Sequence, residues 1–122
     1  SQINTVSPSG GTTGISASNS NIILNDTQII VTAPGSASGN VIGINALSGS
    51  TVTINGSNTA ITSSLTGTRG SSIALTTDES SEQEMQGGIL SVSGAGTTTV
   101  PTQGSAVLNS VTCITNGITG AC

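Results

Sequence analysis

Four of the five carboxylates in this chain lie within seven residues, at Asp78, Glu79, Glu82 and Glu84. Clustered carboxylate oxygens suit Ca²⁺, and a pair of carboxylates can cleave a glycosidic bond as general acid and nucleophile. The cluster lacks the Asp-x-Asp-x-Asp-Gly order of calcium loops, and no basic or aromatic residue accompanies it. We therefore interpret residues 78–87 as a solvent-exposed acidic insertion, and we expect no metal, no cofactor and no catalytic residue.

Cys113 and Cys122, the only cysteines, are nine residues apart. Their spacing fits no metal-binding pattern, whereas a disulfide across it would stabilise the fold by roughly 2.5 to 3 kcal/mol through loop closure. We expect a disulfide within one chain, with two free thiols as the alternative. A disulfide indicates an oxidising compartment, and a composition rich in Ser, Thr and Asn without Lys agrees with a secreted protein.

The composition excludes several classes of function. The chain has no histidine, lysine or aromatic residue, and Arg69 is its one cation. It therefore lacks an imidazole for acid–base catalysis or zinc binding, positive charge for nucleic acid, and rings for stacking on sugars or bases. No apolar run exceeds four residues, so we expect no membrane span. A first residue other than Met is what a mature protein shows after signal-peptide removal.

Hydroxyl and amide motifs leave a binding function open. Thr-x-Thr occurs at residues 51–53 and within 97–99. Threonines stacked on a flat face could order water and bind ice, although threonine also simply favours the solvent face of a strand. Residues 25–27 and 55–57 are N-glycosylation sequons, which a chain so rich in Asn, Ser and Thr contains by chance.

Strands must position these residues. Ile, Val and Thr make up 42 of the 122 residues, and β-branched side chains favour strands. In residues 51–55, Val52 and Ile54 alternate with polar residues, which is typical of a half-buried strand. Pairs such as Asn55-Gly56 supply the sharp corners. No stretch has helical spacing, and the core must be narrow because no aromatic residue is available to fill it.

The sequence repeats with a period of 29 to 30 residues. Residues 14–17 align with 43–46, and residues 22–25 with 52–55, while a third copy begins near Ser72 and continues beyond the acidic insertion. An incomplete fourth copy is expected to start at residues 106–109 and to end in the cysteine loop. Three short strands per copy predict an all-β parallel β-solenoid of about three to four coils, with an antiparallel β-sandwich as the alternative. Stacked coils predict a polar ladder of Asn25 and Asn55 and three interior ladders. The interior ladders are Ile15, Ile44 and Ile73, then Ile22, Val52 and Leu90, and then Leu24, Ile54 and Val92.

The stretch from Gly43 to Ser57 resembles the degenerate repeats of the β-helical passenger domains of bacterial autotransporters and related surface adhesins. The resemblance extends over about residues 13–104. It implies an extracellular, right-handed parallel β-helix with a structural or adhesive function.

We divide the chain into an N-terminal extended segment, residues 1–12, and a solenoid domain, residues 13–122. The segment is expected to fold back as a partial cap or to join a neighbouring subunit as an added strand. A short solenoid exposes unpaired strand edges at both ends, which are templates for another chain. We therefore predict a secreted, non-enzymatic structural protein that lies at the cell surface or outside the cell. Its copies are expected to bind one another head to tail in a filament, or else the protein serves as a surface adhesin. An ice-binding or glycan-binding module that contacts surface glycans is the alternative, and a polysaccharide-cleaving enzyme ranks third.

Overall fold

The structure is a computed structural model that describes residues 2–6, 11–33, 40–66, 70–94 and 98–122. Every element in this part of the chain is a β-strand. The strands, in chain order, are β1 Gln2–Val6, β2 Thr12–Ser18, β3 Asn21–Asn25, β4 Gln28–Ala33, β5 Asn40–Leu47, β6 Thr51–Asn55, β7 Ala60–Leu65, β8 Ser71–Thr77, β9 Glu82–Gln86, β10 Ile89–Gly94, β11 Thr98–Gln103, β12 Ala106–Asn109, β13 Thr112–Thr115 and β14 Ile118–Ala121.

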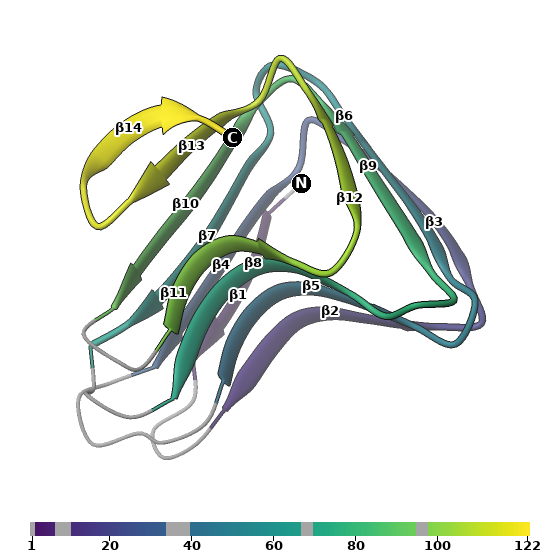
Figure 1. Cartoon of the computed structure of the whole chain (residues 1–122), viewed down its shortest axis with the longest axis horizontal. Coiled ribbons are helices and arrows are strands. Elements are labelled where there is room, and N and C mark those ends of the chain that lie inside the picture. Colours follow the sequence, from purple (N-terminus) through teal and green to yellow (C-terminus); the bar gives the residue numbers. More distant parts are fainter. Residues whose placement is uncertain (1, 7–10, 34–39, 67–69, 95–97) are drawn as a thin grey trace.

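The strands form three sheets that make the sides of a triangle (Figure 1). Sheet A has the order β1-β4-β7-β10-β13-β14, sheet B is β2-β5-β8-β11, and sheet C is β3-β6-β9-β12. Every pairing is parallel except that of β13 with β14. Each coil therefore contributes one strand to each sheet, as β2, β3 and β4 do, and the predicted β-solenoid is confirmed over the antiparallel sandwich.

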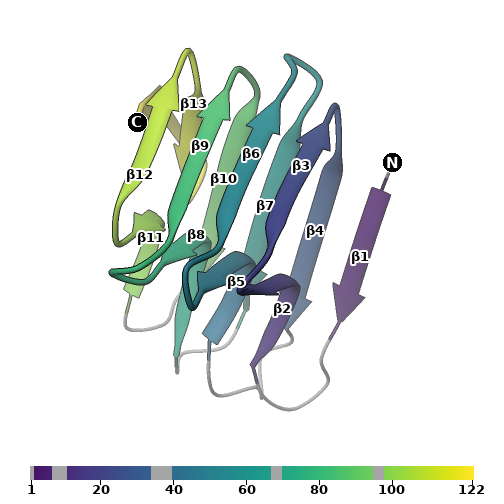
Figure 2. The same ribbon diagram turned by 90° about the vertical axis from the view of Figure 1, so that its right-hand side faces the viewer.

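The coils are right-handed. In Figure 1 the C-terminal coil is nearest the viewer, and the chain runs counter-clockwise from sheet B through sheet C to sheet A. Figure 2 shows the same progression from the side, with β3, β6, β9 and β12 in parallel array. Because the chain advances toward the viewer as it turns counter-clockwise, the helix has a right-handed sense.

The interior consists of stacked apolar rows. In sheet C, Leu24 pairs with Ile54 as expected, and Ile54 is fully buried. The third member of this row is Met85, so the prediction that places Val92 there is wrong. The prediction of Leu90 beside Val52 is wrong as well, because Val52 pairs with Gln83 and Leu90 pairs with Ile61 in sheet A. Val92 is buried beside Ser63 in sheet A. The prediction failed because it took β10 for the strand of sheet C, a position that β9 fills.

The predicted ladder of Ile15, Ile44 and Ile73 needs a similar correction. Ile15 pairs with Ile44 in sheet B, but Ile44 then pairs with Leu75, and Ile73 pairs with Ile42. Ile73 is buried, yet it lies outside the main core cluster. In the apolar run Ile-Ala-Leu at 73–75, either Ile73 or Leu75 can be aligned with Ile44. Matching of apolar residues favoured Ile73, whereas the hydrogen-bonded register pairs Leu75 with Ile44.

Sheet B bends along one row of residues (Figure 1). This bend explains why residues 73–75 could be aligned with β5 in two ways. The ladder skips Gly14, Gly43 and Ala74, so the alternation of inward and outward residues is interrupted there. A Cβ atom on Gly43 would lie 2.5 Å from the carbonyl oxygen of Ala74 and 2.5 Å from Cγ2 of Ile61. Glycine at position 43 therefore allows sheets A and B to approach closely.

Residues 78–87 are not an insertion. Glu82–Gln86 forms β9, which lies between β6 and β12 in sheet C. Gln83 and Met85 point into the core and are 2% and 0% exposed, whereas Glu82 and Glu84 are exposed. The prediction of a solvent-exposed insertion is wrong because one of the two inward residues is polar, so the alternating apolar pattern of a strand is not visible in the sequence. The Gln83 amide is accommodated by donating to the carbonyl oxygen of Thr76 at 2.9 Å.

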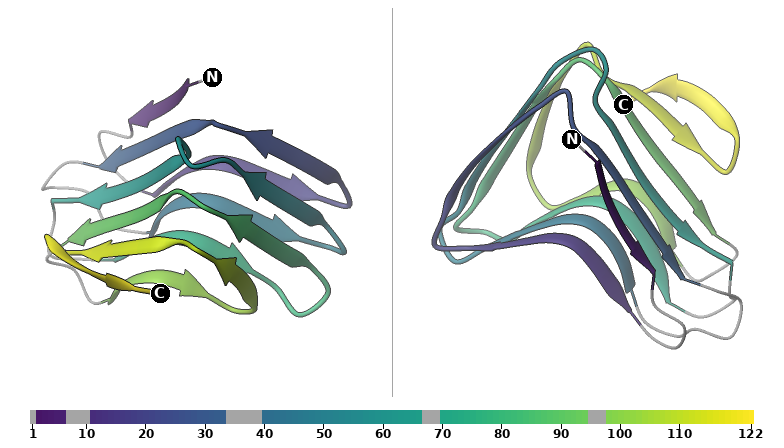
Figure 3. Two further views of the ribbon diagram at one scale, coloured as in Figure 1. Left: turned by 90° about the horizontal axis from the view of Figure 1, so that it is seen from above. Right: turned by 180° about the vertical axis from the view of Figure 1, so that it is seen from behind.

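The N-terminal segment folds back on its own chain. β1 pairs in parallel with β4, and Ile3 lies beside Ile29 in a row of sheet A. Residues 7–10 lie outside the described residues. Figure 3 shows β1 as the first strand of the stack, so residues 2–6 are part of the solenoid.

Candidate functional site

The carboxylates do not converge. Glu82 and Glu84 lie on the outer face of sheet C, while Asp78 and Glu79 lie at the corner between sheets B and C. Within the ranges described, no group of three or more His, Cys, Asp or Glu could hold a metal ion.

Asp78 holds that corner together. Its Oδ2 accepts a hydrogen bond from the backbone N–H of Ser48 at 2.8 Å, and its Oδ1 accepts from the N–H of Ser80 at 3.0 Å. These bonds favour the ionised carboxylate and lower the pKa of Asp78, with the Ser48 N–H contributing most, followed by the hydroxyl of Ser81. The interaction ties one coil to the next, so we assign this carboxylate a structural role.

Acid should weaken this corner. Because the pKa of Asp78 is lowered in the folded state, its stabilisation is complete above the unfolded value of 3.8 and disappears as the pH falls through the folded pKa. We expect the melting temperature of the wild type to fall between about pH 5 and pH 2, and the Asp78→Asn variant to show a smaller fall. Equal slopes in a thermal melting series for the two proteins would contradict this role.

Short polar side chains line this corner and the corner between sheets C and A. The hydroxyl of Ser50 accepts from the N–H of Ser20, and the hydroxyl of Ser81 accepts from the N–H of Ser50. At the other end of sheet C, Nδ2 of Asn55 lies 3.4 Å from Oδ1 of Asn25, which confirms the predicted asparagine ladder. These contacts satisfy polar backbone and side-chain groups where the strands turn.

The Thr-x-Thr pair at residues 51–53 does not extend into a column. Thr51 lies between Asn21 and Glu82, and Thr53 lies between Ile23 and Glu84. The two threonines are therefore flanked by residues that do not repeat their hydroxyls. In the second motif, Thr97 lies outside the described residues, as does Arg69.

The predicted disulfide is confirmed. Cys113 and Cys122 are bonded, with their Cα atoms 5.1 Å apart. The bond joins the start of β13 to the residue after β14 and so closes the C-terminal hairpin, which turns at Asn116 and Gly117 with φ angles of 49° and 82°. A disulfide is compatible with an oxidising, extracellular environment.

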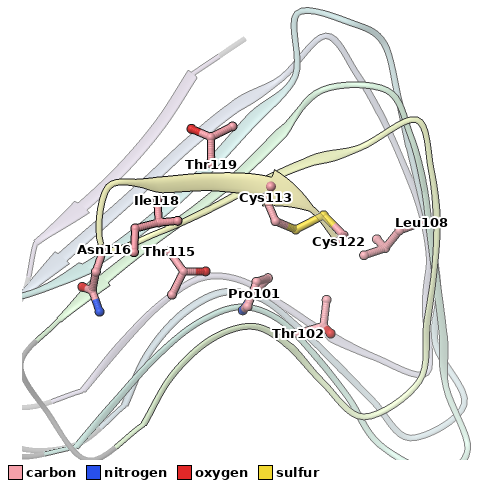
Figure 4. A pocket seen from close by; sticks show the side chains of 10 residues that line it. Pro101, Thr102, Leu108, Cys113, Thr115, Asn116, Ile118, Thr119 and Cys122 are labelled. Atoms are coloured by element: carbon pink, nitrogen blue, oxygen red, sulfur yellow. A yellow bond between two sulfur atoms is a disulfide. The ribbon is translucent and has the colours of Figure 1, made fainter.

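A cavity of about 510 Å³ opens beneath this hairpin, at the C-terminal end of the core (Figure 4). Figure 4 shows Pro101, Leu108 and the disulfide around it, with Ile118 on the hairpin side. The cavity arises because sheet A continues into β14, whereas sheets B and C finish at β11 and β12. Its lining residues are Pro101, Thr102, Leu108, Cys113, Thr115, Asn116, Ile118, Thr119, Gly120 and Cys122.

The two ends of the solenoid leave strand edges open. In the described part of the chain, β2 and β3 at one end and β11 and β12 at the other pair on one side only. Sheet A reaches one strand further at each end, through β1 and β14. Backbone N–H and C=O groups of an open edge can accept another strand.

The end strands of sheet C resemble each other. β3 ends in Ile-Ile-Leu-Asn and β12 is Ala-Val-Leu-Asn, and the register places the two segments on the same rows. Ile23 and Val107 point outward and are 64% and 56% exposed. Between them, on the same row, lie Thr53 and Glu84. Large apolar side chains are therefore exposed on this row only at its two ends.

No protein-family model, curated protein or solved structure matches the chain. The fold alone defines the class, which is a short right-handed parallel β-solenoid of three sheets. Among the described residues there is no helix with the length and apolar character needed to cross a membrane.

The likeness of residues 22–25 to 106–109 agrees with the predicted fourth copy of the repeat. The C-terminal hairpin was not predicted, although the sequence carries a signal for it. Asn116-Gly117 lies between two short β-prone segments, which is a strong hairpin signal.

Proposed function

We propose that this protein is a secreted structural protein whose copies assemble end to end through the open edges of sheets B and C. The observation that carries the proposal is the match between β3 and β12 at opposite ends of sheet C. Both strands run in the same direction, so β3 of a second copy can continue sheet C beyond β12 with parallel hydrogen bonds.

Such a junction brings like residues together. Ile23 of the second copy would lie on Val107, Leu24 on Leu108, and Asn25 on Asn109. The first two pairings cover exposed or half-buried apolar side chains, and the third repeats the Asn25–Asn55 contact within one chain. Cross-strand pairs of this kind contribute about 0.2 to 1 kcal/mol each. Because the contact is head to tail, it need not close and can extend into a fibre.

An alternative function is binding of ice or of neutral glycans, and the outer face of sheet A favours it. None of the six strands of this sheet carries a charged residue. Thr62, Ser64, Ser91 and Ser93 point outward from its central strands, and the hydroxyls of Ser93 and Ser64 lie 3.2 Å apart. A neutral, hydroxylated face of this kind could hydrogen-bond to water layers or to sugars.

Lysine at the end of sheet C tests the assembly proposal. We expect wild-type protein to form larger species as its concentration rises, and Val107→Lys to stay smaller because a charged edge disfavours strand addition. The matched control is Glu84→Lys, which places the same charge on the same row one coil earlier. Sedimentation velocity over a concentration series measures the difference.

Two results would contradict the proposal. The first is a wild-type protein that remains a monomer at every concentration, which would favour the binding alternative. The second is equal assembly of the wild type and Val107→Lys, which would place any contact elsewhere than the end of sheet C.

A further inference from the structure

The proposed junction meets an obstacle in sheet A. If all three sheets continue into a second copy, β4 of that copy takes the position beside β13. In the single chain β14 already occupies that position, and it runs antiparallel to β13. No further parallel strand can pair with β13 while β14 remains in place.

We infer that the β13–β14 hairpin is a disulfide-restrained cap over the surface that accepts a second copy. This inference rests on the proposed end-to-end assembly. The acceptor surface comprises the edge of β13 together with the open edges of β11 and β12. Its partner is the N-terminal coil of another copy of this chain. In that second copy β1 must also leave β4, because β13 of the first copy takes its place there.

Few contacts other than the disulfide hold β14. Ile118 is 77% exposed, and Thr119 and Gly120 are exposed as well. The strand pairs with β13 over only four residues, from Thr112 to Thr115. Isolated two-stranded hairpins are marginally stable in water, so the covalent bond contributes much of the restraint.

The geometry of the bond explains how it acts. Cys113 is 5% exposed at the start of β13, where it continues the interior row of Leu90. Its bond to Cys122 fixes the last residue of the hairpin at the rim of the core (Figure 4). With the bond closed, β14 can leave β13 only as part of a small ring, whereas with the bond open its four residues can detach without a covalent link to β13.

Reduction releases this restraint. A dithiol reductant supplies two electrons and two protons, the bond between the two Sγ atoms breaks, thiols form on Cys113 and Cys122, and the reductant closes to its own disulfide. We expect the amide protons of residues 118–121 to exchange about 10- to 100-fold faster after reduction. The 100-fold limit corresponds to losing the whole loop-closure free energy of a ring of this size.

Assembly should respond in the same direction. We expect the concentration at which larger species first form to fall by about 10- to 100-fold on reduction. The double variant Cys113→Ala/Cys122→Ala should behave like the reduced wild type and should not respond to the reductant. Circular dichroism of every sample establishes that the solenoid remains folded, and reoxidation of the wild type should restore the original threshold.

The two readouts separate this inference from the proposed function. Unchanged exchange in residues 118–121 after reduction would overturn the cap, whatever the protein assembles into. Equal or higher assembly thresholds after reduction would also overturn it while leaving end-to-end assembly intact. Faster exchange without assembly in any sample would support a disulfide-restrained hairpin but refute the second copy as the partner of the surface beneath it, together with the proposed function.

Discussion

Replacing Ile54 by aspartate will unfold the protein. Ile54 is fully buried in the row that contains Leu24 and Met85. The described residues include no cation that could pair with a carboxylate at this position, and an unpaired buried charge costs several kcal/mol. Domains of this size are stable by about 5 to 15 kcal/mol, so the substitution removes a large part of the total. Loss of the β-sheet signal in circular dichroism measures the effect.

Asn55→Asp is the matched control for this substitution. It adds the same carboxylate one residue later, where Asn55 is half-buried at the corner and its neighbours Asn25 and Gln86 are uncharged. We expect this variant to fold. A folded, soluble Ile54→Asp protein with an unchanged spectrum would contradict the register described for sheet C.

Deleting residues 82–86 will also abolish folding. These five residues form one side of the triangle in the third coil and pair with both β6 and β12. A five-residue strand spans about 16 Å. After the deletion Ser81 would be bonded directly to Gly87, with their Cα atoms about 3.8 Å apart. The chain could then no longer connect the two corners of sheet C, and thermal melting should show no cooperative transition.

The double variant Glu82→Gln/Glu84→Gln is the control for the acidic character of this segment. Both side chains are exposed, so removing their charge should change the free energy of unfolding by only about 0.5 kcal/mol each. A deletion variant that folds as well as this control would mean that residues 82–86 form a dispensable loop.

The fold class follows from the sequence because stacking repeats like residues at like positions. The pairs Leu24–Ile54 and Ile15–Ile44 and the asparagine ladder were all predictable from a period of about 30 residues. The disulfide followed from elimination, since only two cysteines exist and their spacing suits no metal.

The third coil was harder to predict because its strands do not follow the apolar pattern. Gln83 lies where the first two coils have Ile22 and Val52, and its burial depends on hydrogen bonds to backbone oxygens of sheet B. A search for apolar rows passes over such a strand and assigns the next apolar segment, residues 89–94, in its place. The bend at Gly43 adds a second source of error, because it interrupts the alternation that fixes the register.

The ends depend on information that a repeat does not contain. The open edges of β11 and β12 follow from the number of coils, and were expected. β14 breaks the parallel pattern, and its direction is set by the turn at Asn116 and Gly117 and by the disulfide. The cap on sheet A therefore arises from the turn and the covalent bond instead of from the stacking of coils.

Electron microscopy of the purified protein over a range of concentrations tests most directly whether the solenoid ends are assembly surfaces. Assembly through these ends predicts unbranched fibres one solenoid wide, with strands across the fibre axis and a repeat of about 4.8 Å along it. The cap on sheet A predicts that such fibres form at lower concentration after reduction. Single particles of uniform size at every concentration, in both redox states, would contradict it.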